Sequence, residues 1–268
     1  MPASALRDHI EFTVSRRLPG SLTYKPLLSP EMVPTAIAVF DELSGGGIPR
    51  GCLTEVYGAA SSGRTTVLVS LLAQVTRRGE LAALVDIMDS FAPDVAAEAG
   101  VELNSLLWMR CGGWGKNERQ KKWGVEARVE QALKITDWLL QAGGFSVIAL
   151  DLAGVPPHWA RRIPLTSWFR FRRAVENTAT AFLLLEEQPY AKTCASLVVS
   201  MSRAKVHWSA MQPDEPEQNN HQRNTRLLKE ITFSAEIIRS RLETAAELRR
   251  SRPTGFSAET GWSIQSAS

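Results

Sequence analysis

Residues 57–66 form a glycine-bounded loop, Tyr57-Gly58-Ala59-Ala60-Ser61-Ser62-Gly63-Arg64-Thr65-Thr66. An extended apolar segment, 52–57, precedes this loop, and an apolar run, 67–73, follows it. A strand, a glycine-bounded loop and a helix in this order are the context of the phosphate-binding pattern G-x-x-x-x-G-K-[ST]. Its glycines let the backbone approach an anion closely, and the start of the helix directs unpaired N–H groups at that anion. The candidate nucleotide-binding residues of the loop are Gly58, Ser61, Ser62, Gly63, Arg64, Thr65 and Thr66.

One position of the loop departs from that pattern. Arg64 stands where the phosphate-binding lysine is expected, whereas the spacing, both glycines and the hydroxyl of Thr65, the type that binds Mg²⁺, are kept. Arginine is a rigid planar fork and lysine a compact point charge, so the exchange alters a tight site. The sequence therefore predicts the loop and leaves open whether it still acts on nucleotides.

The composition is that of an ordinary globular protein, with 268 residues of which 44% are hydrophobic and 22% charged. One full core with appended termini is the simplest organisation for this length. The net charge of +3 permits nucleic acid or an acidic partner but predicts neither. Cys52, Cys111 and Cys194 lack metal-ligand spacing, and no signal peptide or membrane span is recognisable. We therefore expect a cytoplasmic protein.

Short apolar runs alternate with helical stretches from residue 51 onward, which is typical of βα units. The pattern predicts helices at 64–78, 93–99, 125–142 and 166–176, and strands at 81–86, 106–110, 145–151 and 179–185. Trp138 is expected in the apolar stripe of the third helix. Hairpin-type strands are expected at 195–202 and 205–208, and alternating apolar residues predict a further strand at 231–237. The predicted fold class is thus α/β: a central, mostly parallel twisted sheet flanked by helices, with antiparallel strands at the C-terminal end.

Three segments are expected along the chain. Residues 1–32 hold a short helix and a linker, and this helix either packs on its own domain or serves as a docking arm for a neighbouring protein. Residues 33–240 form the core domain, with a polar, flexible loop at 212–224. Residues 241–268 form a tail for binding partners, in which Phe256 and Trp262 are candidates for an apolar docking motif.

The order of these segments resembles the RecA family. Residues 33–51, with Phe40-Asp41-Glu42-Leu43-Ser44-Gly45-Gly46-Gly47-Ile48-Pro49-Arg50-Gly51, are similar to the lead-in to the RecA phosphate loop, and 55–66 are similar to the loop itself. Leu84-Val85-Asp86 and 100–107 match the units that follow, and Asp151 falls at the Walker B position. The resemblance covers residues 33–240 and implies a RecA-like P-loop core.

Within this superfamily the chain looks most like ImuA, the RecA-like member of bacterial mutagenesis cassettes. This similarity lies in the segment 161–177, from Arg161 to Asn177, and in the altered loop sequence at 62–66. The family implies an accessory role in DNA repair by error-prone (translesion) synthesis after DNA damage, as part of the SOS response. It also implies three partners: an ImuB-like Y-family polymerase homologue, an error-prone replicative-type polymerase, and RecA as a further candidate. The expected location is the cytoplasm, with association to the nucleoid when engaged.

The resemblance also indicates which RecA chemistry is kept. Thr65 and Asp151 retain the groups that organise Mg²⁺, so ATP or ADP with Mg²⁺ is the candidate cofactor. The water-activating glutamate expected two residues after Asp86 is Met88, which can neither accept a proton nor orient a water. Asp89 lies next to it and could substitute, but its side chain would point in another direction, and a structural role is the favoured interpretation for Asp86. We therefore expect no catalytic residue and no turnover. The aromatic residue that stacks on adenine in RecA is replaced by an aliphatic one near position 95.

Two basic, aromatic stretches are candidates for binding DNA or a protein partner. Their candidate residues are Trp114, Lys121, Lys122 and Trp123 in the first and Arg161, Arg162, Arg170, Arg172 and Arg173 in the second. Interleaved cations and rings suit single-stranded nucleic acid, and Trp and Arg are also favoured anchors of protein interfaces. The plainer alternatives are a surface loop for the first stretch and a helix with solvated arginines for the second. The loop at 186–193, where RecA grips DNA, opens with two carboxylates that repel phosphate.

These observations favour a RecA-like accessory protein that recruits polymerase-type partners without hydrolysing ATP. Two other functions remain open. The first is a DNA-dependent ATPase in which Arg64 replaces the lysine, and the second is a SulA-like inhibitor of cell division.

Overall fold

The computed structural model describes residues 30–111, 124–208, 228–242 and 254–259. Within these ranges one eight-stranded sheet forms the centre of the molecule, in the order β10-β9-β8-β3-β7-β6-β4-β5. Its strands are β3 (Leu53–Gly58), β4 (Ala82–Asp86), β5 (Leu106–Arg110), β6 (Val147–Asp151), β7 (Ala181–Glu186), β8 (Leu197–Trp208), β9 (Leu228–Ser240) and β10 (Thr254–Glu259). The six neighbouring strands β8, β3, β7, β6, β4 and β5 pair in parallel. Strand β9 is antiparallel to β8, and β10 is antiparallel to β9.

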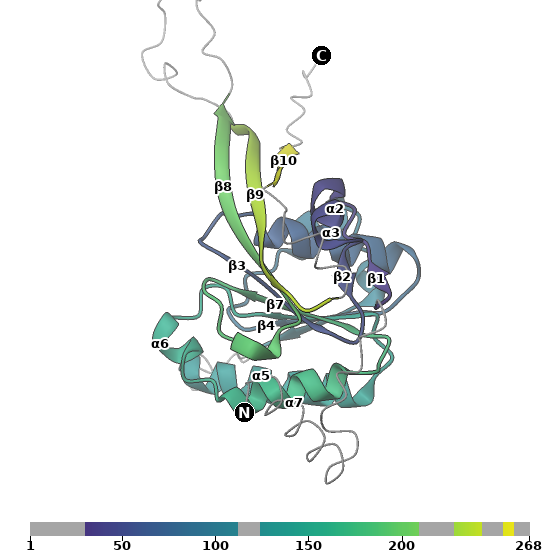
Figure 1. Cartoon of the computed structure of the whole chain (residues 1–268), viewed down its shortest axis with the longest axis vertical. Helices are drawn as coiled ribbons and strands as arrows, with labels where there is room; N and C mark the ends of the chain where they lie inside the picture. The colour runs from purple at the N-terminus through teal and green to yellow at the C-terminus, as the bar shows by residue number, and fades with distance from the viewer. Residues whose placement is uncertain (1–29, 112–123, 209–227, 243–253, 260–268) are drawn as a thin grey trace, which may run out of the picture.

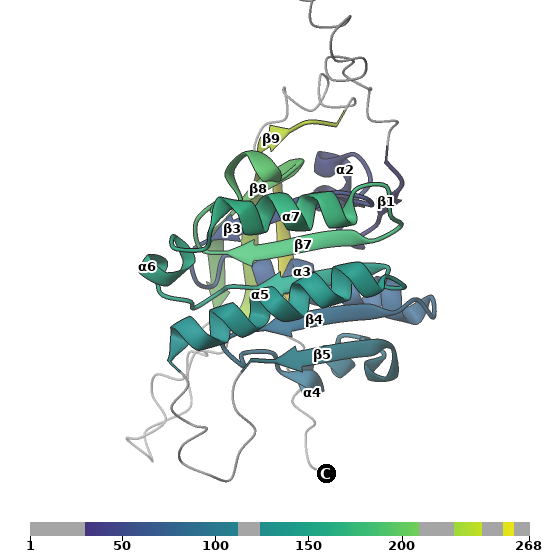
Figure 2. The ribbon, with the colours of Figure 1, turned by 90° about the horizontal axis from the view of Figure 1, so that it is seen from below.

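Helices cover both faces of this sheet (Figure 1), and Figure 2 shows α5 and α7 lying across one of them. The other face carries α2 and α3. The helices are α2 (Ala38–Ser44), α3 (Arg64–Arg77), α4 (Pro93–Glu98), α5 (Val125–Ala142), α6 (Pro157–Ala160) and α7 (Leu165–Val175), with 3-10 turns η1 (Leu103–Ser105) and η2 (Lys192–Cys194). A short antiparallel pair, β1 (Met32–Val33) and β2 (Ile48–Pro49), precedes β3. The fold class predicted from the sequence is confirmed.

Burial on both faces explains the composition of the central strands. Every residue of β4, β6 and β7 is buried, and their apolar side chains divide between two core clusters, one on each face. Strands of parallel sheets covered by helices on both sides therefore read as nearly continuous apolar runs. Asp86, Asp151 and Glu186 interrupt these runs at the last position of each strand. All three carboxyl groups thus lie at one edge of the sheet.

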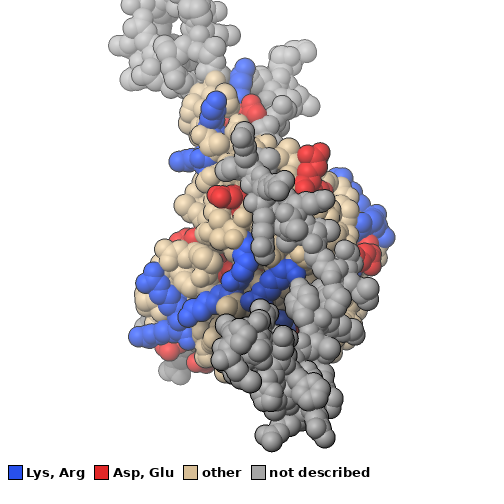
Figure 3. Space-filling view, viewed as in Figure 1, with Lys and Arg blue, Asp and Glu red and all other residues tan. Residues whose placement is uncertain are grey.

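The C-terminal third differs from the prediction in two ways. The strands expected at 195–202 and 205–208 are one continuous strand, β8, whose irregularities in pairing with β9 include a bulge between Arg203 and Lys205. The outer halves of β8 and β9 extend beyond the body of the domain as a ribbon (Figures 1 and 3). Within the segment predicted to be a tail, residues 254–259 form β10 and complete the sheet.

Two side chains are placed differently from their predictions. Trp138 is 68% exposed on α5, so its assignment to the apolar stripe is wrong. Phe256 is 8% exposed and packs on Phe233 of β9, with ring centroids 5.5 Å apart. Phe256 is therefore part of the core, and the prediction that it belongs to an apolar docking motif is wrong. The N-terminal helix, the loop at 212–224 and Trp262 lie outside the described residues.

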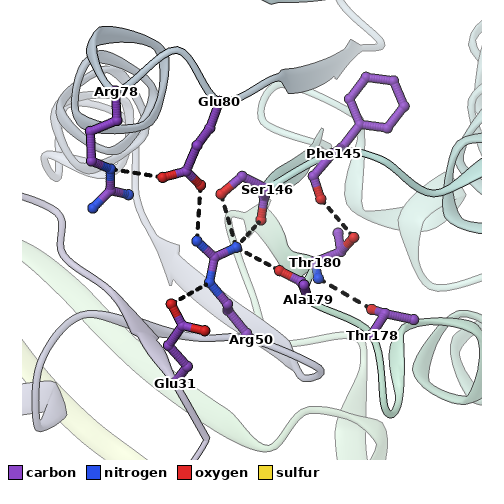
Figure 4. A network of polar contacts seen from close by, with 9 residues as sticks. All are labelled: Glu31, Arg50, Arg78, Glu80, Phe145, Ser146, Thr178, Ala179 and Thr180. Atoms are coloured by element: carbon purple, nitrogen blue, oxygen red, sulfur yellow. Dashed lines mark hydrogen bonds and ion pairs between the residues drawn. The ribbon is translucent and has the colours of Figure 1, made fainter.

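Arg50 joins the amino-terminal ends of several strands (Figure 4). Its guanidinium donates to the hydroxyl of Ser146 at 2.9 Å and to the carbonyl of Ala179 at 2.5 Å, directly before β6 and β7. It also donates to Glu80, before β4, at 2.9 Å, and forms an ion pair with Glu31 at 3.3 Å. This arginine lies at the opposite edge of the sheet from the phosphate-type loop, and its role is to hold the sheet together.

Candidate functional site

The glycine-bounded loop connects β3 to α3 at the carboxyl edge of the sheet, as predicted. Gly58 has no room for a side chain, because a Cβ there would lie 2.2 Å from the carbonyl oxygen of Met201 on β8. Gly63 adopts φ +93°, and a Cβ on it would lie 2.7 Å from the ring of Phe233 on β9. Both glycines are therefore required by the close packing of β8 and β9 against the loop.

Two buried polar groups of the loop lack partners. Arg64 is 7% exposed and Ser62 2% exposed, and neither Nη1 of Arg64 nor Oγ of Ser62 has a hydrogen-bond partner among the described residues. Buried polar groups are nearly always hydrogen-bonded, so such atoms indicate a missing partner. A phosphate oxygen is a suitable acceptor for both groups. The loop residues therefore fit the phosphates of a nucleotide, with the backbone from Gly58 to Thr66 as the cradle.

Carboxylates surround the guanidinium of Arg64. Burial lowers the pKa of this guanidinium, and the carboxyl groups of Asp151, Glu187 and Glu186 lie near enough to oppose that shift when they are ionised. An anion entering the loop would meet these carboxylates as well as Arg64. Asp151 and the hydroxyl of Thr65, which is exposed at the start of α3, are the groups that would hold Mg²⁺, and the charge of a bound Mg²⁺ would offset that repulsion.

Asp151 occupies the position expected for a metal-binding carboxylate. It lies beside Asp86 in the register of β6 and β4, is 9% exposed, and accepts a hydrogen bond from the N–H of Ala153 at 2.8 Å. Burial raises the pKa of Asp151 to about 6, and the charge of Asp86 adds to this rise. Ionisation of Asp151 therefore lowers the stability of the folded state, and a bound cation would offset this loss.

The end of β4 has no carboxylate free to activate water within the described residues. The carboxylate of Asp86 accepts from the N–H groups of Ser90 and Phe91 and from the indole N–H of Trp108, at 3.0–3.2 Å. This organises the loop after β4 and agrees with the structural role favoured for Asp86. Met88 packs against the core cluster under α5 and α7.

Asp89 forms a bidentate pair with Arg110, both distances being 2.5 Å. The hydrogen bonds from Arg110 lower the pKa of Asp89. The carboxylate of Asp89 is therefore committed to an ion pair with Arg110. Val95, near the position where RecA stacks adenine, is 62% exposed on α4.

Comparison with known proteins agrees with this arrangement. A family model, the RecA N-terminal domain, matches residues 28–158. Protein RecA of Kineococcus radiotolerans is 36% identical over 122 residues, 45% of this chain and 31% of that protein. The core is RecA-like. Protein RecA of Symbiobacterium thermophilum is 36% identical over 125 residues (46% and 31%), and that of an Arthrobacter species 37% over 122 residues (45% and 30%). The matched part of the chain spans about a third of the length of these relatives.

The RecA-like core contains a buried carboxyl pair that the sequence analysis missed. Oε1 of Glu55 on β3 accepts from the N–H groups of Tyr190 and Ala191 at 2.7 and 2.8 Å, and Oε2 of Glu186 accepts from Tyr190 at 2.9 Å. Burial raises the pKa of both glutamates, and the charge of Glu55 raises that of Glu186 further. A single glutamate in the apolar strand 52–57 was the available signal. The pair anchors the segment after β7.

The predicted arginines do not form one site. Arg161 donates to Gln188 at 3.0 Å, and the guanidinium of Arg162 lies 4.8 Å from the ring centroid of Trp159. Arg170 pairs with Asp137 of α5 at 2.9 Å. The other two, Arg172 and Arg173, line a hollow on the outer side of α7. The four candidates Trp114, Lys121, Lys122 and Trp123 lie outside the described residues.

The described residues hold no cluster of three or more His, Cys, Asp or Glu side chains suited to a metal ion. Among the helices that the structure describes, none has the length and apolar character needed to cross a membrane.

Proposed function

We propose that this RecA-like chain is an accessory protein of the ImuA type, which binds nucleotide without hydrolysing it and recruits polymerase-type partners for error-prone DNA synthesis after damage. The partners we expect are an ImuB-like polymerase homologue and an error-prone replicative-type polymerase. The observation that carries the loss of catalysis is the end of β4, where Asp86 and Asp89 are committed to other contacts and Met88 replaces the expected base.

Phosphate binding without turnover follows from the different demands of the two processes. Binding needs backbone N–H groups, a cation and a hydroxyl, and the loop supplies these from Gly63, Arg64 and Thr65. Hydrolysis also needs a group that orients and deprotonates water, and losing such a group costs a factor of roughly 100 to 10,000 in rate. The sequence likeness at 161–177 supports the ImuA type, and the RecA-like core supports the general class.

The first experiment measures nucleotide binding and turnover separately. We expect a fluorescent ATP analogue to bind in the presence of Mg²⁺, with weaker binding by Arg64→Ala and by Asp151→Asn. With Mg-ATP and single-stranded DNA, we expect no release of phosphate above that of Arg64→Ala. DNA-stimulated hydrolysis that disappears in Asp151→Asn would instead establish a DNA-dependent ATPase.

A restoring variant tests the reason for inactivity. Met88→Glu combined with Arg64→Lys returns the two side chains that the RecA pattern requires. We expect this double variant to hydrolyse ATP measurably, whereas Met88→Gln with Arg64→Lys, which lacks the base, does not. Equal inactivity of the two variants would mean that other features of the loop prevent turnover.

Recruitment is tested by co-purification with the ImuB-like partner. The truncated protein for this experiment must end after Glu259, because β10 and Phe256 belong to the core. We expect the full chain to retain the partner and the truncated chain to retain less. Equal recovery would remove residues 260–268 from the interface, and no recovery with either chain would contradict the accessory role.

A further inference from the structure

The outer side of α7 carries a hollow of about 580 Å³ lined by Phe169, Arg172, Arg173, Glu176 and Asn177. The first four recur at spacings of three and four residues, so they share one side of the helix. The opposite side of α7 is buried in the core under the sheet. Phe169 is 46% exposed, which leaves its ring available to a ligand.

Two arginines at the end of β9 share a buried neighbour, Cys194, with Arg172. Arg172 of α7, Arg239 of β9 and Arg241 just beyond it all lie close enough to the thiol of Cys194 to lower its pKa, against the larger rise that burial causes. The guanidinium of Arg239 donates to the carbonyl groups of Lys192 and Ala195, so it is committed to holding η2. We call Phe169, Arg172 and Arg173 the α7 basic face.

The charges of α7 itself differ in their availability. Arg170 is held by Asp137 of α5, whereas Arg172 and Arg173 make no ion pair within the described ranges. The one acid among the residues that line the hollow is Glu176. Arg172 and Arg173, which form no ion pair in the described part of the chain, lie beside a single exposed ring, and this combination suits a polyanion that carries planar groups.

A nucleic acid fits this surface better than a protein does. Arginine is enriched in protein interfaces too, but the centre of such an interface is largely apolar, and the lining of this hollow contains a single large apolar side chain, Phe169. Phe169 lies about one helical turn, ~5 Å, from Arg172 and Arg173. A ring and two cations at this spacing can bind the base and the phosphate of one nucleotide together.

We propose that the α7 basic face binds single-stranded nucleic acid, with phosphates on the arginines and a base stacked on Phe169. The face lies on the opposite side of the sheet from α3 and is distinct from the phosphate-type loop. The proposal does not depend on nucleotide binding or on a polymerase partner.

Fluorescence anisotropy of a labelled oligothymidylate, titrated with the full chain over a range of NaCl concentrations, tests this proposal. Each phosphate contact on a single strand contributes about 0.7 to the slope of log affinity against log salt. The double variant Arg172→Gln, Arg173→Gln is expected to lower that slope by about 1.4. Phe169→Ala is expected to weaken binding by about 5- to 150-fold with no change in slope, because stacking releases no counterion.

Arg170→Gln is the matched control, because it removes the same charge from the same helix on the side that faces α5. Thermal unfolding of each variant shows whether it is folded. If Arg170→Gln lowers the slope of log affinity against log salt as much per charge as the double variant does, the net charge of the protein rather than the α7 basic face is responsible. That result would overturn the proposal. Failure of the wild-type chain to bind the oligonucleotide would also overturn it, as would equally tight binding of polyglutamate that Phe169→Ala leaves unchanged.

Discussion

Substituting Asp151 with asparagine should stabilise this protein at neutral pH. The side chain lies at the end of β6, 9% exposed and beside Asp86, where burial raises its pKa from 3.8 to about 6. Asparagine has almost the same shape, and its Oδ1 can accept the same hydrogen bond from Ala153 that Oδ1 of Asp151 accepts now. The substitution therefore removes an unfavourable charge and keeps the local contacts.

The expected magnitude follows from proton linkage. A carboxyl group whose pKa is higher in the folded than in the unfolded state does not lower stability at a pH below the unfolded pKa, because it is protonated in both states. As the pH rises from the unfolded to the folded pKa, the folded state is progressively destabilised. For Asp151 this window runs from 3.8 to about 6. At about 1.4 kcal/mol per pKa unit, the ionised group costs about 3 kcal/mol above this window. Asp151→Asn should therefore equal the wild type in stability near the lower limit of the window and exceed it by about 3 kcal/mol at neutral pH.

Urea unfolding, followed by tryptophan fluorescence at several pH values, measures this difference. Asp89→Asn is the control of opposite sign, because Arg110 lowers the pKa of Asp89 and its charge is favourable in the folded state. That variant should be less stable than the wild type at neutral pH, with the difference shrinking as the pH falls. An Asp151→Asn protein that is less stable at neutral pH, or whose gain is independent of pH, would refute the assignment of Asp151 as a buried, destabilising charge.

Three further substitutions probe the frame of the site and can be compared by the same urea assay. Arg50→Ala should lower the free energy of unfolding by about 2–3 kcal/mol, since it removes charged hydrogen bonds at the amino ends of β4, β6 and β7. A loss below about 0.5 kcal/mol would contradict the role of Arg50 in holding these strands together. Gly58→Ala should lower the free energy of unfolding by about 3 kcal/mol, because the added Cβ would overlap the carbonyl oxygen of Met201. An unchanged urea midpoint would show that β8 can shift to make room for the Cβ. Glu186→Gln should be tolerated or stabilising above the usual glutamate pKa, because the raised pKa keeps Glu186 protonated beside Glu55; strong destabilisation there would mean that its charge is needed.

Unbroken local patterns predicted most of the fold. The strand at 106–110 and the helix at 125–142 agree with β5 and α5, and the loop at 57–66 lies between β3 and α3. These elements follow from apolar periodicity and from glycines at fixed spacing, which act within a few residues of each other. Patterns of this kind do not say which side of a helix is covered. Trp138 was therefore assigned to the core although nothing packs over it enough to bury it.

The sequence alone determined that this chain carries a RecA-like loop with arginine in place of lysine and methionine in place of the expected base. The tertiary structure decided what surrounds those residues. It alone showed the carboxylates around Arg64, the pairing of Asp89 with Arg110, the shared anchoring by Glu55 and Glu186, and the burial of Phe256 in β10. Each of these contacts joins residues from different strands or loops. Their energies depend on strand order and distance in space, which no local pattern of side chains records.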